Sequence, residues 1–204
     1  MAITSIKTGS SFTNLVKYND FLGPNSAYIP SSFESIATVT AAGGETSLNF
    51  TSIPGTYSSL QIRGIAKDTY TTGTGEATDT TITFNNDTAQ NYRNHQLRGN
   101  GTSAVAAAPA NATYSMGALV TMIYGTATNM FGVSIIDIHD YASTTKYKTV
   151  RGFSGGDLNS GTTTSNLRLG SGLWMSTSAI TSVQIQAVVS GFAAGSTFAL
   201  YGIK

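Results

Sequence analysis

The chain lacks cysteine, has few charges and contains no long hydrophobic run, and each absence excludes a class of protein. Without cysteine there are no disulfides, thiolate metal ligands or cysteine nucleophiles. Charged residues make up only 10% of the 204 residues, against about 25% in ordinary globular proteins. The formal net charge of +1 gives no positive electrostatic potential to attract a phosphate backbone, so we expect no nucleic-acid partner.

The hydrophobic pattern also bears on location. No segment approaches the ~20 apolar residues that cross a bilayer, so we expect no membrane partner. The first residues show no charged region followed by an apolar run, which is the pattern of a secretory signal. We therefore expect synthesis in a cytoplasm. The low charge weakens the repulsion that keeps proteins apart in solution, and this favours a protein that assembles with partners, including other copies of itself.

Residues 1–33 differ from the rest of the chain because they show no clean alternation. Leu15, Tyr18 and Leu22 would share one stripe of a short helix that ends before Gly23. The segment is too apolar for a free tail, so we expect an arm that docks, either on its own domain or on a neighbouring subunit. The residues expected to bind the partner are Phe12, Leu15, Tyr18, Phe21, Leu22 and Tyr28.

Residues 34–204 show the pattern of an all-β domain. Short runs with a period of two are broken by Gly, Pro, Asn and Asp. Leu60 and Ile62 are expected to point inward, as are Ile82 and Phe84. About ten short strands without a long helix favour an antiparallel β-sandwich, jelly-roll or Greek-key in style, with an N-terminal arm.

Turn signals add detail to this prediction. Gly43 and Gly44 separate two alternating runs and predict a hairpin. Residues 68–80 and 99–113 are expected to be long loops. The second is Ala-rich, but Pro109 and the flanking Gly and Asn residues argue against a helix.

One stretch, "SIIDIHDYASTTKYKTV" (residues 134–150), raises the question of a metal or acid–base site. Alternation places Ile136 and Ile138 on one face of a strand and Asp137 and His139 on the other. Imidazole and carboxylate both suit zinc or iron, so Asp137 and His139 are weak candidates for metal ligands. A third ligand is needed, and His95 is the only other histidine.

The alternative is an exposed strand face whose acids, Asp137 and the turn residue Asp140, are paired. Lys146, Lys148 and Arg151 lie on the next expected strand and could pair with these acids across a hairpin. We favour this second interpretation. We accordingly expect no metal and no cofactor.

Catalytic motifs are also absent from the sequence. No GxGxxG or Walker pattern opens a helix, no GxSxG elbow is present, and nothing singles out a pair of glycosidase carboxylates. We therefore expect a protein without enzymatic activity. Glycan binding is the stronger rival, because an exposed aromatic ring can stack on a sugar. The single Trp174 is expected to be buried, which leaves Tyr70 and Tyr92 as the candidate glycan contacts.

Four stretches carry a resemblance to known proteins: "YSSLQIRGIAKDT", "TFNNDTAQNYRNHQLRGNG", "SIIDIHDYASTTKYKTVRGFSG" and the closing "GSTFALYGIK". In these the chain, from about Phe33 onward, resembles a group of tailed-bacteriophage virion proteins of the cyanophage and marine-phage type. Members of the group are described as structural proteins, sometimes as tail-fibre or decoration proteins. The resemblance implies a place in the particle and no catalytic residues. Its implied partners are the major capsid protein or a head or tail component, and a trimer is one option for the oligomer.

These observations lead to one expectation and one alternative. The expectation is a non-enzymatic structural protein on the exterior of a phage virion, assembled in the host cytoplasm. Its role would be capsid decoration, with residues 1–33 helping to anchor it. The alternative is a head- or tail-fibre or receptor-binding module with a lectin-like affinity for a host surface glycan.

Overall fold

The computed structural model of the chain describes residues 32–71, 78–109, 111–123, 129–157 and 166–204. Within these ranges the chain forms twelve strands. The same ranges contain no helix that is long and apolar enough to cross a membrane. The paired strands run antiparallel throughout. The prediction of an all-β antiparallel sandwich is confirmed.

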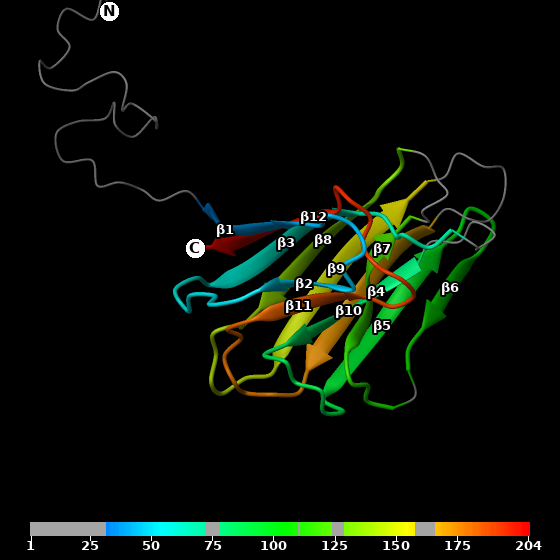
Figure 1. The fold of residues 1–204 in the computed structure, drawn as a ribbon. Helices are drawn as coiled ribbons and strands as arrows, with labels where there is room; N and C mark the ends of the chain where they lie inside the picture. Colours follow the sequence, from blue (N-terminus) through cyan, green and yellow to red (C-terminus); the bar gives the residue numbers. More distant parts are fainter. Residues whose placement is uncertain (1–31, 72–77, 110, 124–128, 158–165) are drawn as a thin grey trace, which may run out of the picture. The chain divides into compact units, whose positions relative to one another are not determined.

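The strands form two sheets that pack together (Figure 1). The larger sheet has eight strands in the order β1-β12-β3-β8-β9-β10-β5-β6, and the smaller has four in the order β2-β11-β4-β7. The bounds are β1 Phe33–Thr40, β2 Ser47–Phe50, β3 Ser59–Ala66, β4 Thr78–Phe84, β5 Tyr92–Gly99, β6 Ala104–Ala107, β7 Met116–Met122, β8 Gly132–His139, β9 Lys148–Gly156, β10 Asn166–Trp174, β11 Val183–Ala187 and β12 Thr197–Ile203.

The core lies between the sheets and follows the period of two in the sequence. Leu60, Ile62, Ile82 and Phe84 are all fully buried, as the alternation predicts. The single Trp174 is also buried, as predicted. Fully burying an aliphatic or aromatic side chain of this size stabilises the fold by about 1.5–3 kcal/mol, so these positions hold the two layers together.

The predicted hairpin at Gly43 and Gly44 is wrong. Both glycines have positive φ, so a turn is present, but β1 pairs with β12 while β2 pairs with β11 in the other sheet. The carboxylate of Glu45 accepts hydrogen bonds from the N–H groups of Ala42 and Gly43 at 2.9 and 2.8 Å. The turn therefore closes on its own side chain and carries the chain from one sheet to the other.

Two of the strands, β5 and β6, lack the apolar alternation that would predict them from the sequence. β5 occupies the inner part of the large sheet between β10 and β6, and β6 is an edge strand with all four residues exposed. β5 was missed because polar residues occupy both of its faces: Asn94 is buried, while His95 is exposed. β6 lies within the predicted loop at 99–113, and its exposure explains why it shows no apolar alternation.

Candidate interaction surface

The stretch around Asp137 is a polar, cross-strand network on the outer face of the large sheet. On β8, Ile136 and Ile138 are buried, while His139 is exposed on the opposite face, as predicted. The Asp137 carboxylate accepts hydrogen bonds from Arg151 Nη2 at 2.8 Å and from Gln61 Nε2 at 2.7 Å. The predicted pairing across the β8–β9 hairpin is therefore present.

The electrostatics of Asp137 follow from these contacts. Burial raises the pKa of its carboxyl, but the hydrogen bonds from Gln61 and Arg151 and the nearby charges of Arg151 and His139 outweigh it. The net effect holds the pKa of Asp137 below its ordinary value. Asp137 is thus a carboxylate engaged by neighbours on both adjacent strands.

The third ligand suggested by the sequence does not lie near this pair. His95 is on β5, and the register runs from Asp137 through Arg151 and Ser171 to His95. Three strand spacings of about 4.8 Å separate Asp137 from His95. Among the described residues, no group of three or more His, Cys, Asp or Glu could hold a metal ion.

Lys146 and Lys148, the other two cations that were expected to pair with acids, have different surroundings. Lys146 Nζ lies 3.0 Å from Asp140 Oδ1, as expected. Lys148 instead points inward and is fully buried, so its predicted pairing with an acid is wrong. Its Nζ donates to the carbonyl oxygens of Ser143 at 2.6 Å and Lys146 at 2.9 Å and lies 5.9 Å from the ring centroid of Trp174. Burial lowers the pKa of Lys148, while the charge of Asp140 opposes this.

The two tyrosines predicted to contact a glycan lie in different surroundings. Tyr92 is fully buried and stacks on Trp174 at a centroid distance of 6.4 Å, so its ring is not available to a sugar and this prediction is wrong. The period of two turns the ring inward because Tyr92 pairs with Trp174 in the ladder between β5 and β10. Tyr70 is half-buried and its N–H donates to Asp68 Oδ1 at 2.9 Å, and its role stays a prediction.

The residues expected to form the docking arm lie in residues 1–31, outside the described residues, so the arm also stays a prediction. They are Phe12, Leu15, Tyr18, Phe21, Leu22 and Tyr28.

The most distinctive surface of the described residues is apolar and was not found from the sequence. Seven large apolar side chains on the outer face of the large sheet are each 43–57% exposed. We call them the outer apolar face: Ile65, Leu97, Val133, Ile135, Phe153, Leu167 and Leu169. They come from five neighbouring strands, β3, β8, β9, β10 and β5, so the pairing of the sheet gathers them into one surface.

Two cross-strand rows make up this face. The register aligns Ile135, Phe153, Leu169 and Leu97 in one row. The next row contains the other three apolar side chains together with two glycines, in the order Ile65, Val133, Gly155, Leu167, Gly99. Because glycine has no side chain, the second row is interrupted where the first is continuous.

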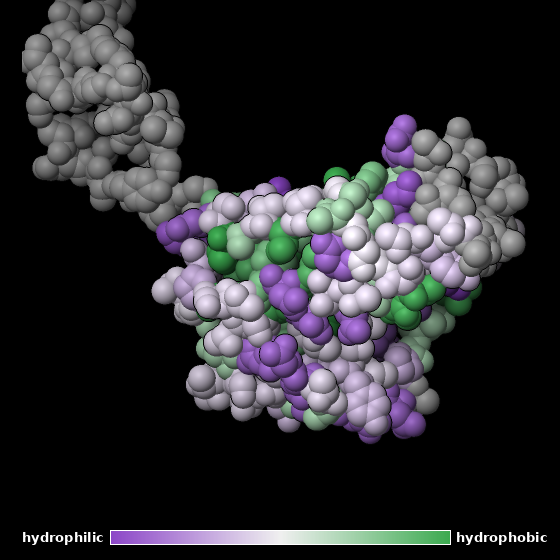
Figure 2. All heavy atoms as spheres, viewed as in Figure 1, coloured by the Kyte–Doolittle hydropathy of each residue, from purple (hydrophilic) through white to green (hydrophobic). Residues whose placement is uncertain are grey.

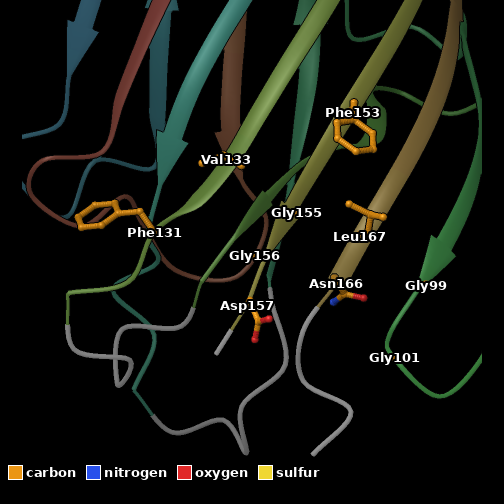
Figure 3. Close-up of a pocket in the computed structure, with 10 residues that line it drawn as sticks. All are labelled: Gly99, Gly101, Phe131, Val133, Phe153, Gly155, Gly156, Asp157, Asn166 and Leu167. Carbon is orange, nitrogen blue, oxygen red and sulfur yellow. The ribbon is translucent and has the colours of Figure 1, made fainter. Parts of the chain in front are cut away.

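The interruption forms a shallow pocket of about 450 Å³ (Figure 3). Val133, Phe153 and Leu167 line it from neighbouring strands, and Asp157 and Asn166 stand at the ends of β9 and β10. On the opposite side of the apolar rows lies the row that contains Gln61, Asp137, Arg151, Ser171 and His95. The apolar surface is therefore bordered by polar groups on two sides, as in protein–protein interfaces.

Figure 2 shows how hydrophilic and hydrophobic residues are distributed on one side of the molecule. Pale, near-neutral residues predominate on the face shown, and strongly hydrophilic ones are scattered among them. Because only 10% of the residues are charged and the formal net charge is +1, charge offers little repulsion against an approaching partner.

Comparisons with known proteins give no relative: no family model, no curated protein and no solved structure matches the chain.

Proposed function

We propose that the chain is a non-enzymatic structural protein on the exterior of a phage virion, where it decorates the capsid and is anchored in part by its N-terminal segment. The observation that carries the proposal is the outer apolar face, because it is an exposed surface suited to burial against another protein. Its seven half-exposed side chains leave roughly 600 Å² of apolar surface open, at the upper end of the largest patches on ordinary monomers, about 300–600 Å².

Two further observations support the proposal. The four stretches that resemble tailed-phage virion proteins include β3, β5, β8, β9 and β12, which lie in the large sheet. Association through apolar area is also not weakened by ordinary salt, whereas attraction between surface charges is screened within about 10 Å at 0.1 M ionic strength. A chain with 10% charged residues suits an assembly held together by apolar contact.

Quantitative mass spectrometry of purified phage particles tests the proposal. We expect the chain in hundreds of copies per particle. A dozen copies would instead indicate a fibre or neck protein, and absence from purified particles would exclude a structural role altogether.

The anchoring part of the proposal has its own experiment. Changing Phe12, Leu15, Phe21 and Leu22 together to serine in the full chain should abolish incorporation into particles while the β-sheet circular dichroism stays unchanged. Changing four serines in the same segment to alanine is the matched control and should leave incorporation intact. Normal incorporation of the first variant would show that the segment is not an anchor.

A further inference from the structure

We propose that the outer apolar face is a self-complementary interface, which binds the same face of a second copy of this chain. The inference rests on the proposed function in one respect. It names the partner of the outer apolar face, which is the surface that supports that function. Attachment to the particle is then left to other parts of the chain.

The area of the face matches what a stable dimer needs. A standard protein–protein interface buries about 800 Å² on each partner. The seven apolar side chains account for roughly 600 Å² of this on one copy, and the bordering polar rows would supply the remainder. The face therefore provides the apolar centre of an interface of ordinary size.

The extent of the face favours a second sheet over a single extended segment. The face crosses five strands, from β3 to β5, and four spacings of about 4.8 Å separate the outermost two. One extended segment covers the width of about one strand. Two sheets that pack face to face, about 10 Å apart, bury both apolar rows at once.

The projecting side chains and the hollows of the two rows complement each other between two copies of the chain. On β9, Phe153 projects from the continuous row, and Gly155 leaves a hollow in the interrupted row two residues further along. On β5, Leu97 and Gly99 repeat this arrangement. A two-fold axis that runs across the strands between the rows would place each projecting row of one copy on the interrupted row of the other.

The charges near the face suit pairing between identical surfaces. Identical faces bring like charges together, so unpaired charges at the border would oppose a dimer. Here Asp137 is paired with Arg151 across β8 and β9. At the end of the continuous row, the Arg63 guanidinium lies over the rings of Phe33 and Tyr201, at 5.2 and 5.3 Å, and so is directed towards β12 and β1. From Ile135 to Leu97 and from Ile65 to Gly99, the two rows contain no charged side chain.

The oligomeric state of the purified full chain tests the inference. We expect light scattering after size-exclusion chromatography to give the mass of a dimer. Changing Phe153 and Leu169 together to serine should weaken the dimer at least tenfold. The control changes Val188 and Val189 to serine, since these side chains are 57% and 53% exposed but lie outside the outer apolar face. It should leave the dimer intact.

Cross-linking identifies the face directly, because the chain has no cysteine of its own. An equimolar mixture of Leu167→Cys and Leu169→Cys proteins should form disulfide-linked heterodimers under mild oxidation, since the proposed axis brings these two positions together. Val188→Cys protein should stay uncross-linked. Equal cross-linking of the Val188→Cys control would overturn the assignment of the face.

Several results would overturn the inference without touching the proposed function. They are a monomeric wild-type chain at concentrations up to about 100 µM, and a Phe153/Leu169 variant that is folded by circular dichroism and still dimeric. Loss of the dimer in the Phe12, Leu15, Phe21 and Leu22 serine variant, with the face variant unaffected, would assign the interface to the N-terminal segment instead. A dimer that is absent from purified particles would keep the inference and refute the proposed function.

Discussion

Removing a single buried hydroxyl, by Tyr92→Phe, tests how the two sheets are joined. The Tyr92 hydroxyl lies 3.0 Å from the N–H of Phe84 and accepts its hydrogen bond, and it can donate to the Asp87 carbonyl oxygen at 3.2 Å. β7 pairs with β4 only as far as Ile82, so beyond that point Tyr92 supplies the acceptor that a neighbouring strand would otherwise provide. The ring itself packs against Phe84 and Trp174 and is kept in the variant.

The expected loss follows from the group left without a partner. A buried N–H that loses its acceptor costs about 1–3 kcal/mol, whereas the ring contacts are unchanged. We expect Tyr92→Phe to lower the free energy of unfolding by that amount at pH 7, with an unchanged dependence on urea concentration. Tyr147→Phe is the matched control because Tyr147 is half exposed, and its effect should stay within about 0.5 kcal/mol.

The same variant tests how the stability of the protein depends on pH. Burial raises the pKa of Tyr92 to about 12, and Asp87 adds to this, against the effect of the Phe84 hydrogen bond. Between the ordinary pKa of 10.0 and about 12, the unfolded chain releases a proton that the folded chain keeps, so the wild type loses stability there. The Phe variant lacks this loss, which amounts to about 1.4 kcal/mol per pH unit. The stability difference between the two proteins should therefore shrink as the pH rises from 10 to 12.

Urea titrations followed by tryptophan fluorescence would measure both effects. Trp174 is the only tryptophan and lies in the same aromatic cluster, and circular dichroism provides an independent second probe. A Tyr92→Phe protein as stable as the wild type at pH 7 would refute the role of the hydroxyl. A stability difference that is constant up to pH 12 would refute the raised pKa.

Three other substitutions test separate features of the fold. Gly132→Ala places a methyl group against a main-chain oxygen of β7 that cannot move aside, so we expect a loss of about 1–3 kcal/mol in urea unfolding, while Gly117→Ala, which meets nothing, should cost far less. Asp87→Asn weakens the 2.7 Å hydrogen bond from Trp174 Nε1. Three hydrogen bonds hold the pKa of Asp87 low against the effect of burial, so the wild type should lose more stability than the variant as the pH falls below about 4 in urea titrations. Arg151→Ala removes an ion pair in which Arg151 is largely exposed and Asp137 is mostly buried, and it should change the free energy of unfolding by less than about 1 kcal/mol, a change that becomes smaller in 1 M salt.

The sequence predicts the layers of this protein better than their connections. Alternation identifies the core positions of β3, β4 and β8, because burial of one face imposes a period of two on the chain. It does not reveal which strands pair. The turn at Gly43 and Gly44 has the residues of a hairpin, yet hydrogen bonds from Ala41 to Ser196 and from Gly44 to Phe192 tie it to a distant loop. Such partners are fixed by the packing of the two sheets, which local residues do not encode.

The candidate surface could be predicted only in part for a related reason. The cross-strand pairing of Asp137 with Arg151 follows from opposite charges on consecutive strands, and the sequence indicates it. The outer apolar face depends on which strands become neighbours in the sheet. Leu97 on β5 and Ile65 on β3 are distant in the sequence, and four pairings within the sheet bring them onto one surface. A local signal was present in β8, where Val133 and Ile135 are apolar on the face opposite the core.

In β10, apolar side chains of the outer apolar face are exposed although the local sequence would predict that they are buried. Its sequence contains Leu167, Arg168 and Leu169 in succession, and the simplest reading of alternation would bury the leucines and expose the arginine. The structure has the opposite: Arg168 is buried and paired with Asp79, while both leucines face solvent.

The other end of β10 explains the inversion. Trp174 shares the inward face with Arg168, and its neighbours in the ladders, Tyr92 on β5 and Lys148 on β9, are buried with it. A shift of one residue would bury the leucines but expose Trp174, since every side chain of the strand would change face. Burial of the tryptophan thus fixes the strand, and the exposed leucines follow from it. Their hydration remains unfavourable in a lone subunit, because exposed apolar area costs about 25 cal/mol per Å² relative to burial. Contact between two outer apolar faces would remove that cost while leaving the core pairing of β10 unchanged.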